Sequence, residues 1–157
     1  RHHNHSTHSS PTSSLNLIII MKTAFLVVLA LATVASAAAF SSCGSGTLTV
    51  SSLNVTPNPP VKGKSVEIDV IGSLAAAETG ASLHYTISFI GIPVINKTKN
   101  VCTMDGFKCP IDAGAFKLAI TEDIPSAAPS GSYDLKATLT GSDGKLMACV
   151  TDKLNIT

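Results

Sequence analysis

Four cysteines are the residues of this chain that are best suited to chemistry. Cys102 and Cys109 stand seven positions apart in VCTMDGFKCP, and the others are Cys43 and Cys149. A structural zinc site favours cysteines two to four residues apart, usually with histidines. A thioredoxin-like redox pair has two residues between its cysteines. Neither spacing occurs here, so the sequence predicts no metal site, and we interpret VCTMDGFKCP as a loop closed by a structural disulfide.

Other groups that could catalyse a reaction are sparse. His84, the one histidine after residue 40, stands in an alternating run with serine and threonine, which is typical of a solvated strand residue. Glu122 and Asp123 form a tight acidic pair, and the Ile124-Pro125 that follows favours a solvated turn. No G-x-S-x-G, phosphate-binding glycine loop or H-E-x-x-H motif occurs. We therefore expect no enzyme activity, no catalytic residue and no cofactor.

The N-terminal residues indicate in which compartment the cysteines are used. From Met21 the chain reads MKTAFLVVLALATVASAAAF, with one lysine, an apolar run and an A-x-A pattern at residues 35–37, where a signal peptidase would cleave. Residues 21–39 are therefore predicted to be a secretory signal peptide, because the apolar run is shorter than the roughly 20 residues of a membrane span. Residues 1–20 are interpreted as an upstream extension outside the mature protein. A retained signal anchor over residues 15–39 is the alternative.

Residues 40–157 are expected to form the mature domain, secreted or in an endolysosomal or vacuolar lumen. Without Arg1 and Lys22 its nine lysines oppose ten acidic residues, so its net charge is near −1 and nucleic acid is not an expected partner. In an oxidising compartment four cysteines imply two disulfides. Three pairings are possible. The simplest joins Cys102 to Cys109, which closes a loop, and Cys43 to Cys149, which ties the first strand to the last.

The elements that must position these residues are strands. In ASLHYTISF, residues 81–89, apolar and polar side chains alternate, which predicts a strand with one buried and one solvated face. The same period occurs in residues 65–70, 115–121 and 132–139, and a longer run covers 145–156. Residues 47–55 change phase near Ser51 and Ser52, which predicts a bulge, and Pro93 in residues 92–96 suits an edge strand. About seven antiparallel strands predict an all-β, two-sheet sandwich.

An ordered set of motifs resembles the ML (lipid-recognition) domain family across residues 43–157. The motifs are the first cysteine, P-N-P-P-x-x-G (57–63), C-P-I-x-x-G (109–114), P-x-G-x-Y (129–133) and the final Cys149. The family includes phosphatidylglycerol/phosphatidylinositol transfer proteins and the Niemann-Pick type C sterol carrier. The resemblance implies an immunoglobulin-like sandwich with a lipid cavity between its sheets, and the same two disulfide pairings. Asn96, Ser126 and Ala128 replace residues typical of the sterol carriers, which favours a phospholipid.

The resemblance also assigns a lipid site to inward-facing apolar side chains, which in an ordinary sandwich would only fill the core. The predicted lipid-binding residues are Val66, Ile68, Val70, Leu83, Tyr85, Ile87, Phe89, Ile92, Val94, Phe116, Leu118, Tyr133, Leu135 and Leu139. We expect the mouth near residues 90–97 and 124–130, and because neither segment has a cluster of basic residues, the headgroup would stay exposed. The loop between Cys102 and Cys109 is expected at the rim, where it would hold the entrance in shape.

The function that the resemblance implies is lipid binding and transfer between membranes by a monomer that contacts them transiently. The cargo would be a phospholipid of the phosphatidylglycerol/phosphatidylinositol class or a sterol. The alternative is an ML-type recognition module that presents a lipid to a protein receptor. Of three N-glycosylation sequons, the one at Asn96 is the best candidate, because the others precede a proline or end the chain. A glycan on Asn96 would lie beside the expected mouth.

Overall fold

The alternating runs form β-strands in the computed structural model, which describes residues 40–157. The elements are β1 (Ser41–Ser45), β2 (Leu48–Thr56), β3 (Ser65–Leu74), β4 (Ala81–Phe89), β5 (Ile92–Asn100), the short 3-10 helix η1 (Val101–Thr103), β6 (Gly114–Asp123), β7 (Gly131–Gly141) and β8 (Leu146–Ile156). The predictions of an upstream extension at 1–20 and of a signal peptide at 21–39 lie outside the described residues.

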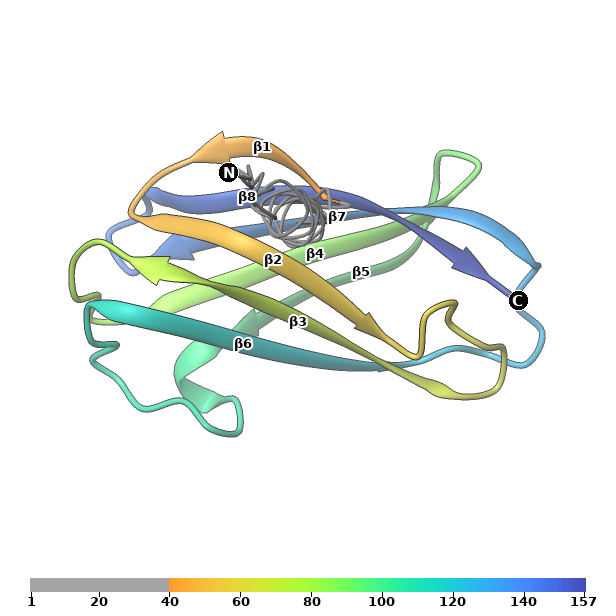
Figure 1. Ribbon diagram of the computed structural model, residues 1–157, viewed down its shortest axis with the longest axis horizontal. Coiled ribbons are helices and arrows are strands. Elements are labelled where there is room, and N and C mark those ends of the chain that lie inside the picture. The colour runs from red at the N-terminus through yellow and green to blue at the C-terminus, as the bar shows by residue number, and fades with distance from the viewer. Residues whose placement is uncertain (1–39) are drawn as a thin grey trace, which may run out of the picture. The chain divides into compact units, whose positions relative to one another are not determined.

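The strands build two antiparallel sheets that face each other (Figure 1). One sheet has the order β1-β8-β7-β4-β5 and the other has the order β2-β3-β6. The predicted two-sheet sandwich is confirmed, with β1 as a strand that the sequence pattern did not predict. Its sequence, SSCGS, lacks apolar alternation because the strand is mostly exposed, and it is held by pairing with β8.

The core forms where the inner faces of the two sheets meet. β3 and β6 pair without interruption, so that Ile68 lies opposite Ile120 and Val70 opposite Leu118, each at most 5% exposed. Similar alternation on β4 and β7 brings Leu83 and other apolar side chains inward from the larger sheet. The alternation of apolar and polar residues therefore places one face of each strand in the core and the other in solvent.

Two irregularities predicted from the sequence are confirmed. The register between β2 and β3 shifts between Val50 and Ser52, which is the expected bulge. β5, which carries Pro93, is the outer strand of its sheet, and β6 is an outer strand of the other sheet. No ladder pairs β5 with β6 in the described part of the chain, so the two sheets are separate along this side.

The two-residue hairpin between β4 and β5 has an unusual residue at its tip. Ile90 has a φ of 51° and Gly91 a φ of 75°, and positive φ at both positions is the pattern of a type I′ turn. Asparagine followed by glycine is the preferred pair in such a turn, whereas a β-branched residue with positive φ is a conformational outlier. The left-handed conformation costs an L-residue about 1–2 kcal/mol. The tip therefore keeps an isoleucine at a cost in stability.

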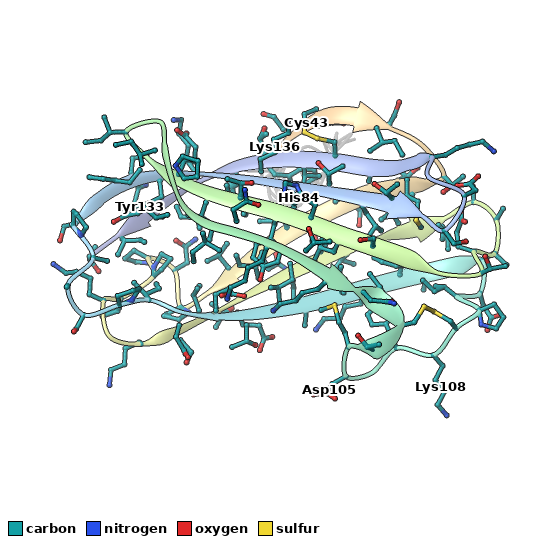
Figure 2. The ribbon with its side chains drawn as sticks, turned by 180° about the vertical axis from the view of Figure 1, so that it is seen from behind. Cys43, His84, Asp105, Lys108, Tyr133 and Lys136 are labelled. Carbon is teal, nitrogen blue, oxygen red and sulfur yellow. A yellow bond between two sulfur atoms is a disulfide. The ribbon has the colours of Figure 1, made fainter. Side chains whose placement is uncertain are left out.

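The loops divide between two ends of the sandwich. We call the end with loops 57–64, 90–91 and 124–130 the hairpin end, and the end with loops 46–47, 75–80, 101–113 and 142–145 the disulfide end. Both predicted pairings are present: Cys43–Cys149 joins β1 to β8, and Cys102–Cys109 closes the loop between η1 and β6. In Figure 2, Tyr133 lies toward the hairpin end, and Asp105 lies at the disulfide end.

Candidate functional site

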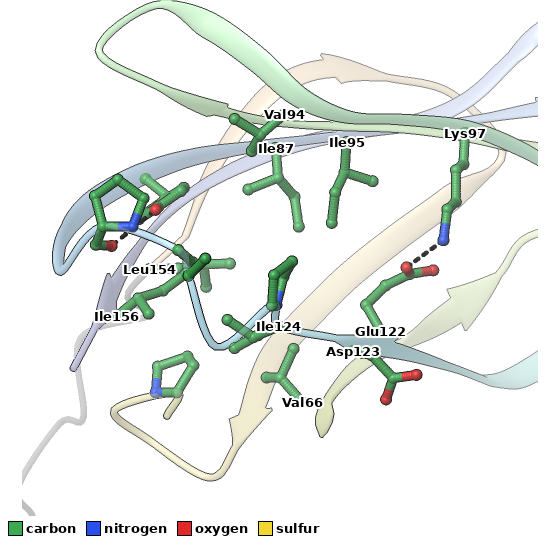
Figure 3. A pocket seen from close by; sticks show the side chains of 16 residues that line it. Val66, Ile87, Val94, Ile95, Lys97, Glu122, Asp123, Ile124, Leu154 and Ile156 are labelled. Atoms are coloured by element: carbon green, nitrogen blue, oxygen red, sulfur yellow. Dashed lines mark hydrogen bonds and ion pairs between the residues drawn. The ribbon is translucent and has the colours of Figure 1, made fainter. Parts of the chain in front are cut away.

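An apolar pocket opens between the two sheets at the hairpin end (Figure 3). Its volume is about 370 Å³. Strands of both sheets and the loop 124–130 supply the walls, and β5 and β6, which both contribute lining residues, do not pair with each other. The lining residues are Pro60, Val66, Ile87, Val94, Ile95, Lys97, Glu122, Asp123, Ile124, Pro125, Ala127, Ala128, Pro129, Tyr133, Leu154 and Ile156.

The predicted lipid-binding residues divide into three groups. Four line this pocket: Val66, Ile87, Val94 and Tyr133. Five line a much smaller cavity of about 20 Å³ between the sheets: Val70, Leu83, Phe116, Leu118 and Leu139. The remaining five, Ile68, Tyr85, Phe89, Ile92 and Leu135, line neither of these cavities. The structure therefore brings only part of the predicted set to the larger pocket.

Ile92 was predicted to bind lipid, but it does not line the pocket, and β5 has a bulge close to it. Ser88 pairs with Pro93 and Ile87 pairs with Ile95, so Val94 is the extra residue. The side chain of Ile92 is 68% exposed. Val94, at 55% exposed, still borders the pocket, and so does Ile95. Two consecutive side chains, Val94 and Ile95, therefore border the pocket, whereas Ile92 pairs with Phe89 at the hairpin end of β5 and lies outside the pocket.

The loop 124–130 and the end of β8 supply pocket residues that were not in the predicted set. Leu154 and Ile156 are buried and continue the alternation of the last run, which is the signal that could have identified them. The hydroxyl of Tyr133 donates to the carbonyl of Pro129 at 2.8 Å, and the Tyr133 ring lies 4.7 Å from that of Phe89. The P-x-G-x-Y motif therefore fixes the loop that forms one wall.

Glu122, at the end of β6, was expected in a solvated turn, and this expectation is wrong. Its side chain is 5% exposed and forms part of the pocket wall. Lys97 donates to its Oε2 at 2.5 Å, and Lys99 donates to its Oε1 at 3.1 Å. The hydroxyl of Tyr85, on β4, also donates to Oε1. Three donors from the larger sheet thus satisfy one buried carboxylate from the smaller sheet.

The surroundings of Glu122 shift two pKa values. Burial would raise the pKa of Glu122, but the hydrogen bonds from Lys97, Tyr85 and Lys99 outweigh burial and hold that pKa below its ordinary value. Burial, followed by the adjacent carboxylate, raises the pKa of Tyr85. Lys99 also lies 5.5 Å from the centre of the Tyr85 ring, within range of a cation–π contact. At neutral pH the cluster therefore holds an ionised carboxylate and a protonated tyrosine.

The loop closed by Cys102 and Cys109 is not at the entrance of this pocket. β5 begins at the hairpin end, beside the pocket, and ends at Asn100 at the disulfide end. The loop starts directly after Asn100, so the length of β5 lies between the loop and the pocket entrance. Figure 2 shows the two labelled loop residues, Asp105 and Lys108, at the end away from Tyr133. The expectation that this disulfide holds the pocket entrance in shape is therefore wrong for the larger pocket.

Asn96 and His84 lie on the outer face of the larger sheet. Both are exposed, and the Nε2 atom of His84 lies 2.9 Å from the Oδ1 atom of Asn96. Because alternate residues of β5 point to opposite faces, Asn96 points away from the face that carries Lys97. A glycan on Asn96 would consequently be attached outside the pocket, although the residue is its neighbour in sequence.

Residues 40–157 contain no group of three or more His, Cys, Asp or Glu side chains that could hold a metal ion. Within the same range, no helix has the length and apolar character of a membrane span.

Comparisons with known proteins match most of the chain. The family model of the ML domain matches residues 37–156. A phosphatidylglycerol/phosphatidylinositol transfer protein of Kluyveromyces lactis is 32% identical over 117 residues, which are 70% of this chain and 68% of that protein. A relative in Dictyostelium discoideum, named for transfer of the same two lipids, is 33% identical over 120 residues, 74% and 84% of the two chains.

A similar arrangement of strands occurs in a solved structure. A Niemann-Pick type C2 protein of the Japanese carpenter ant superposes with a TM-score of 0.63 and 14% sequence identity. The superposition covers 75% of this chain and 98% of the ant protein. At this level of identity the similarity shows a common fold, which agrees with the immunoglobulin-like sandwich.

Proposed function

The chain belongs to the ML-domain family, and on this premise we propose that it is a secreted protein that carries a lipid between membranes in the pocket at its hairpin end. The cargo is a phospholipid of the phosphatidylglycerol/phosphatidylinositol class. The relatives named above are transfer proteins for these two lipids, which supports this choice over a sterol. Residues 40–157 form the mature domain, which acts as a monomer in an extracellular, endolysosomal or vacuolar lumen.

The observation that carries this proposal is the apolar pocket between the sheets. Exposing a methylene group to water costs about 0.8 kcal/mol, so a chain of about 16 carbons would lose on the order of 12 kcal/mol if it crossed water bare. A volume of about 370 Å³ is in the lower part of the range for small-molecule sites. It suits one acyl chain better than a complete two-chain lipid, so the rest of the lipid would extend from the mouth.

The charges at the pocket favour an exposed headgroup. Lys97 lines the wall, but its ammonium group is already bonded to Glu122. The loop 124–130 contains no charged residue. The pocket therefore provides apolar contacts for a chain and no unpaired cation inside it for a phosphate.

The first experiment is native mass spectrometry of the protein from its own source, followed by extraction and identification of bound lipid. One phospholipid per chain is expected, together with transfer of labelled phosphatidylglycerol between vesicles. Bound lipid without transfer would favour the alternative of a recognition module. The absence of both bound lipid and transfer would refute the proposal.

A pair of matched variants tests the pocket itself. Ala128→Trp places a large side chain in the loop that lines the pocket, and Ala76→Trp places the same side chain in an exposed loop at the disulfide end. We expect at least a tenfold loss of lipid binding and transfer for Ala128→Trp, with both disulfides intact, and little change for Ala76→Trp. Equal activity of the two variants would show that the lipid binds elsewhere.

A further inference from the structure

Apolar side chains are exposed mainly at the hairpin end. Five large apolar side chains are exposed among residues 40–157: Val61 at 40%, Ile90 at 80%, Ile92 at 68%, Val94 at 55% and Leu146 at 37%. The first four lie in or beside the loops of the hairpin end, and only Leu146 lies at the disulfide end. Ile90, Ile92 and Val94 form a cluster on one hairpin, and exposed apolar side chains grouped in this way favour contact with a partner.

The tip of the β4–β5 hairpin is the most exposed part of this cluster. Ile90 occupies a left-handed position that asparagine would adopt more easily, and its side chain makes no contribution to the pocket wall. Neither folding nor ligand enclosure accounts for an isoleucine at this position. A surface contact made by its side chain does account for it.

The charges of the two ends differ in sign. The loops of the hairpin end contain Lys62 and Lys64 and no acidic residue. Lys62 donates to Ser130 Oγ, a neutral partner, at 2.8 Å. The acidic residues that directly flank or follow these loops are Glu67, on β3, and Asp123, at the end of β6. The loops of the disulfide end contain four acidic residues and two lysines: Glu78, Asp105, Asp112, Asp143, Lys108 and Lys145.

From this arrangement we propose that the hairpin end docks on an anionic membrane surface, with Ile90 and Ile92 inserted among the lipids and Lys62 and Lys64 at the headgroups. The proposal rests on the proposed function, because the docked end is the one that contains the pocket. Val94 joins the two features, since it is exposed and also borders the pocket. Docking therefore brings the mouth to the membrane without a change of orientation, and the acidic disulfide end faces away.

The test is sedimentation with vesicles of phosphatidylcholine alone or with added phosphatidylserine. Phosphatidylserine supplies negative charge without being the proposed cargo. The wild type should bind the anionic vesicles more strongly, and added salt should weaken that binding. Ile90→Asn should weaken it about tenfold, because an inserted isoleucine side chain is lost. Lys64→Ser should weaken it about fivefold.

Controls distinguish docking from folding and from lipid loading. Asparagine is preferred at the Ile90 position, so Ile90→Asn should raise the melting temperature while it lowers vesicle binding. The matched variants Leu146→Asn and Lys108→Ser, at the disulfide end, should bind vesicles like the wild type. Native mass spectrometry should show the same bound lipid in Ile90→Asn as in the wild type, because Ile90 does not line the pocket.

Several outcomes would overturn the proposal. Unchanged vesicle binding by Ile90→Asn would exclude insertion of the hairpin, and bound lipid in the same sample would leave the proposed function standing. A protein that contains no lipid and transfers none, but binds vesicles through Ile90, would support docking and refute lipid carriage. A wild-type dimer that Ile90→Asn dissociates would assign the apolar cluster to self-association.

Discussion

Replacement of Glu122 by glutamine tests whether this residue joins the two sheets at the pocket. Glu122→Gln preserves the size of the side chain and an oxygen that can accept from the Tyr85 hydroxyl. It removes the negative charge that Lys97 and Lys99 contact. The variant therefore separates the charge of the cluster from its packing.

The expected loss follows from the exposure of the partners. Lys97 and Lys99 are 50% and 34% exposed, so both can turn toward water when the carboxylate is gone. The loss should then be smaller than the roughly 3–5 kcal/mol for leaving a buried charge unpaired. It should resemble the loss of one charge-assisted hydrogen bond, about 1.5–3 kcal/mol. We expect the free energy of unfolding at pH 7 to fall by about 2 kcal/mol.

The difference between wild type and variant should depend on pH. Because folding lowers the pKa of Glu122 below its ordinary value of 4.5, ionisation stabilises the folded state above pH 4.5. This stabilisation is lost as the pH falls through the folded-state pKa. The difference should be constant from neutral pH down to 4.5 and should shrink at lower pH.

Urea unfolding, followed by far-ultraviolet circular dichroism at several pH values, measures this difference. Glu67→Gln is the matched control, because Glu67 is an exposed glutamate on β3, and its effect should stay within about 0.5 kcal/mol. Tyr85→Phe combined with Glu122→Gln gives a double-mutant cycle for the part of the hydroxyl contact that depends on the carboxylate charge. Equal stability of wild type and Glu122→Gln at pH 7, or the same acid dependence in both, would refute the role assigned to the cluster.

Two further predictions concern the frame of the sandwich. Replacing Cys43 and Cys149 by serine should lower the free energy of unfolding by about 4–5 kcal/mol, and replacing Cys102 and Cys109 should lower it by about 2–3 kcal/mol. The difference arises because the longer closed loop restricts the unfolded chain more. Equal losses in urea titrations of the two double variants would contradict this account. Gly72→Ala should cost about 3 kcal/mol or more, since its Cβ would lie 2.3 Å from a main-chain oxygen of β2, and a thermal melt like that of the wild type would contradict it.

The fold could be predicted from the sequence because its strands have one buried face. Alternation identified β3, β4, β6 and β7, and the phase change in residues 47–55 identified the bulge in β2. β1 was missed because it is mostly exposed and has no apolar face. Its place depends on pairing with β8 and on a disulfide, and both of these join residues far apart in sequence.

The candidate site was predicted only in part because it depends on contacts between strands. Glu122 continues the inward phase of Phe116, Leu118 and Ile120, so the alternation did contain the signal for its burial. The donors that make burial possible come from β4 and β5, and their proximity cannot be read from either segment alone. The end at which the pocket opens likewise depends on the pairing of all strands.

The absence of a ladder between β5 and β6 has a consequence for the range of cargo. A barrel closed by main-chain hydrogen bonds can widen only if whole rows of them break, whereas these two strands can move apart when a few side-chain contacts around Glu122 yield. We therefore expect the capacity of the interior to be adjustable. For the proposed function, acyl chains that differ by several carbons should all fit, and each additional enclosed methylene should add about 0.8 kcal/mol to binding from water. Because a membrane buries the same methylene groups, exchange with a membrane should depend little on chain length.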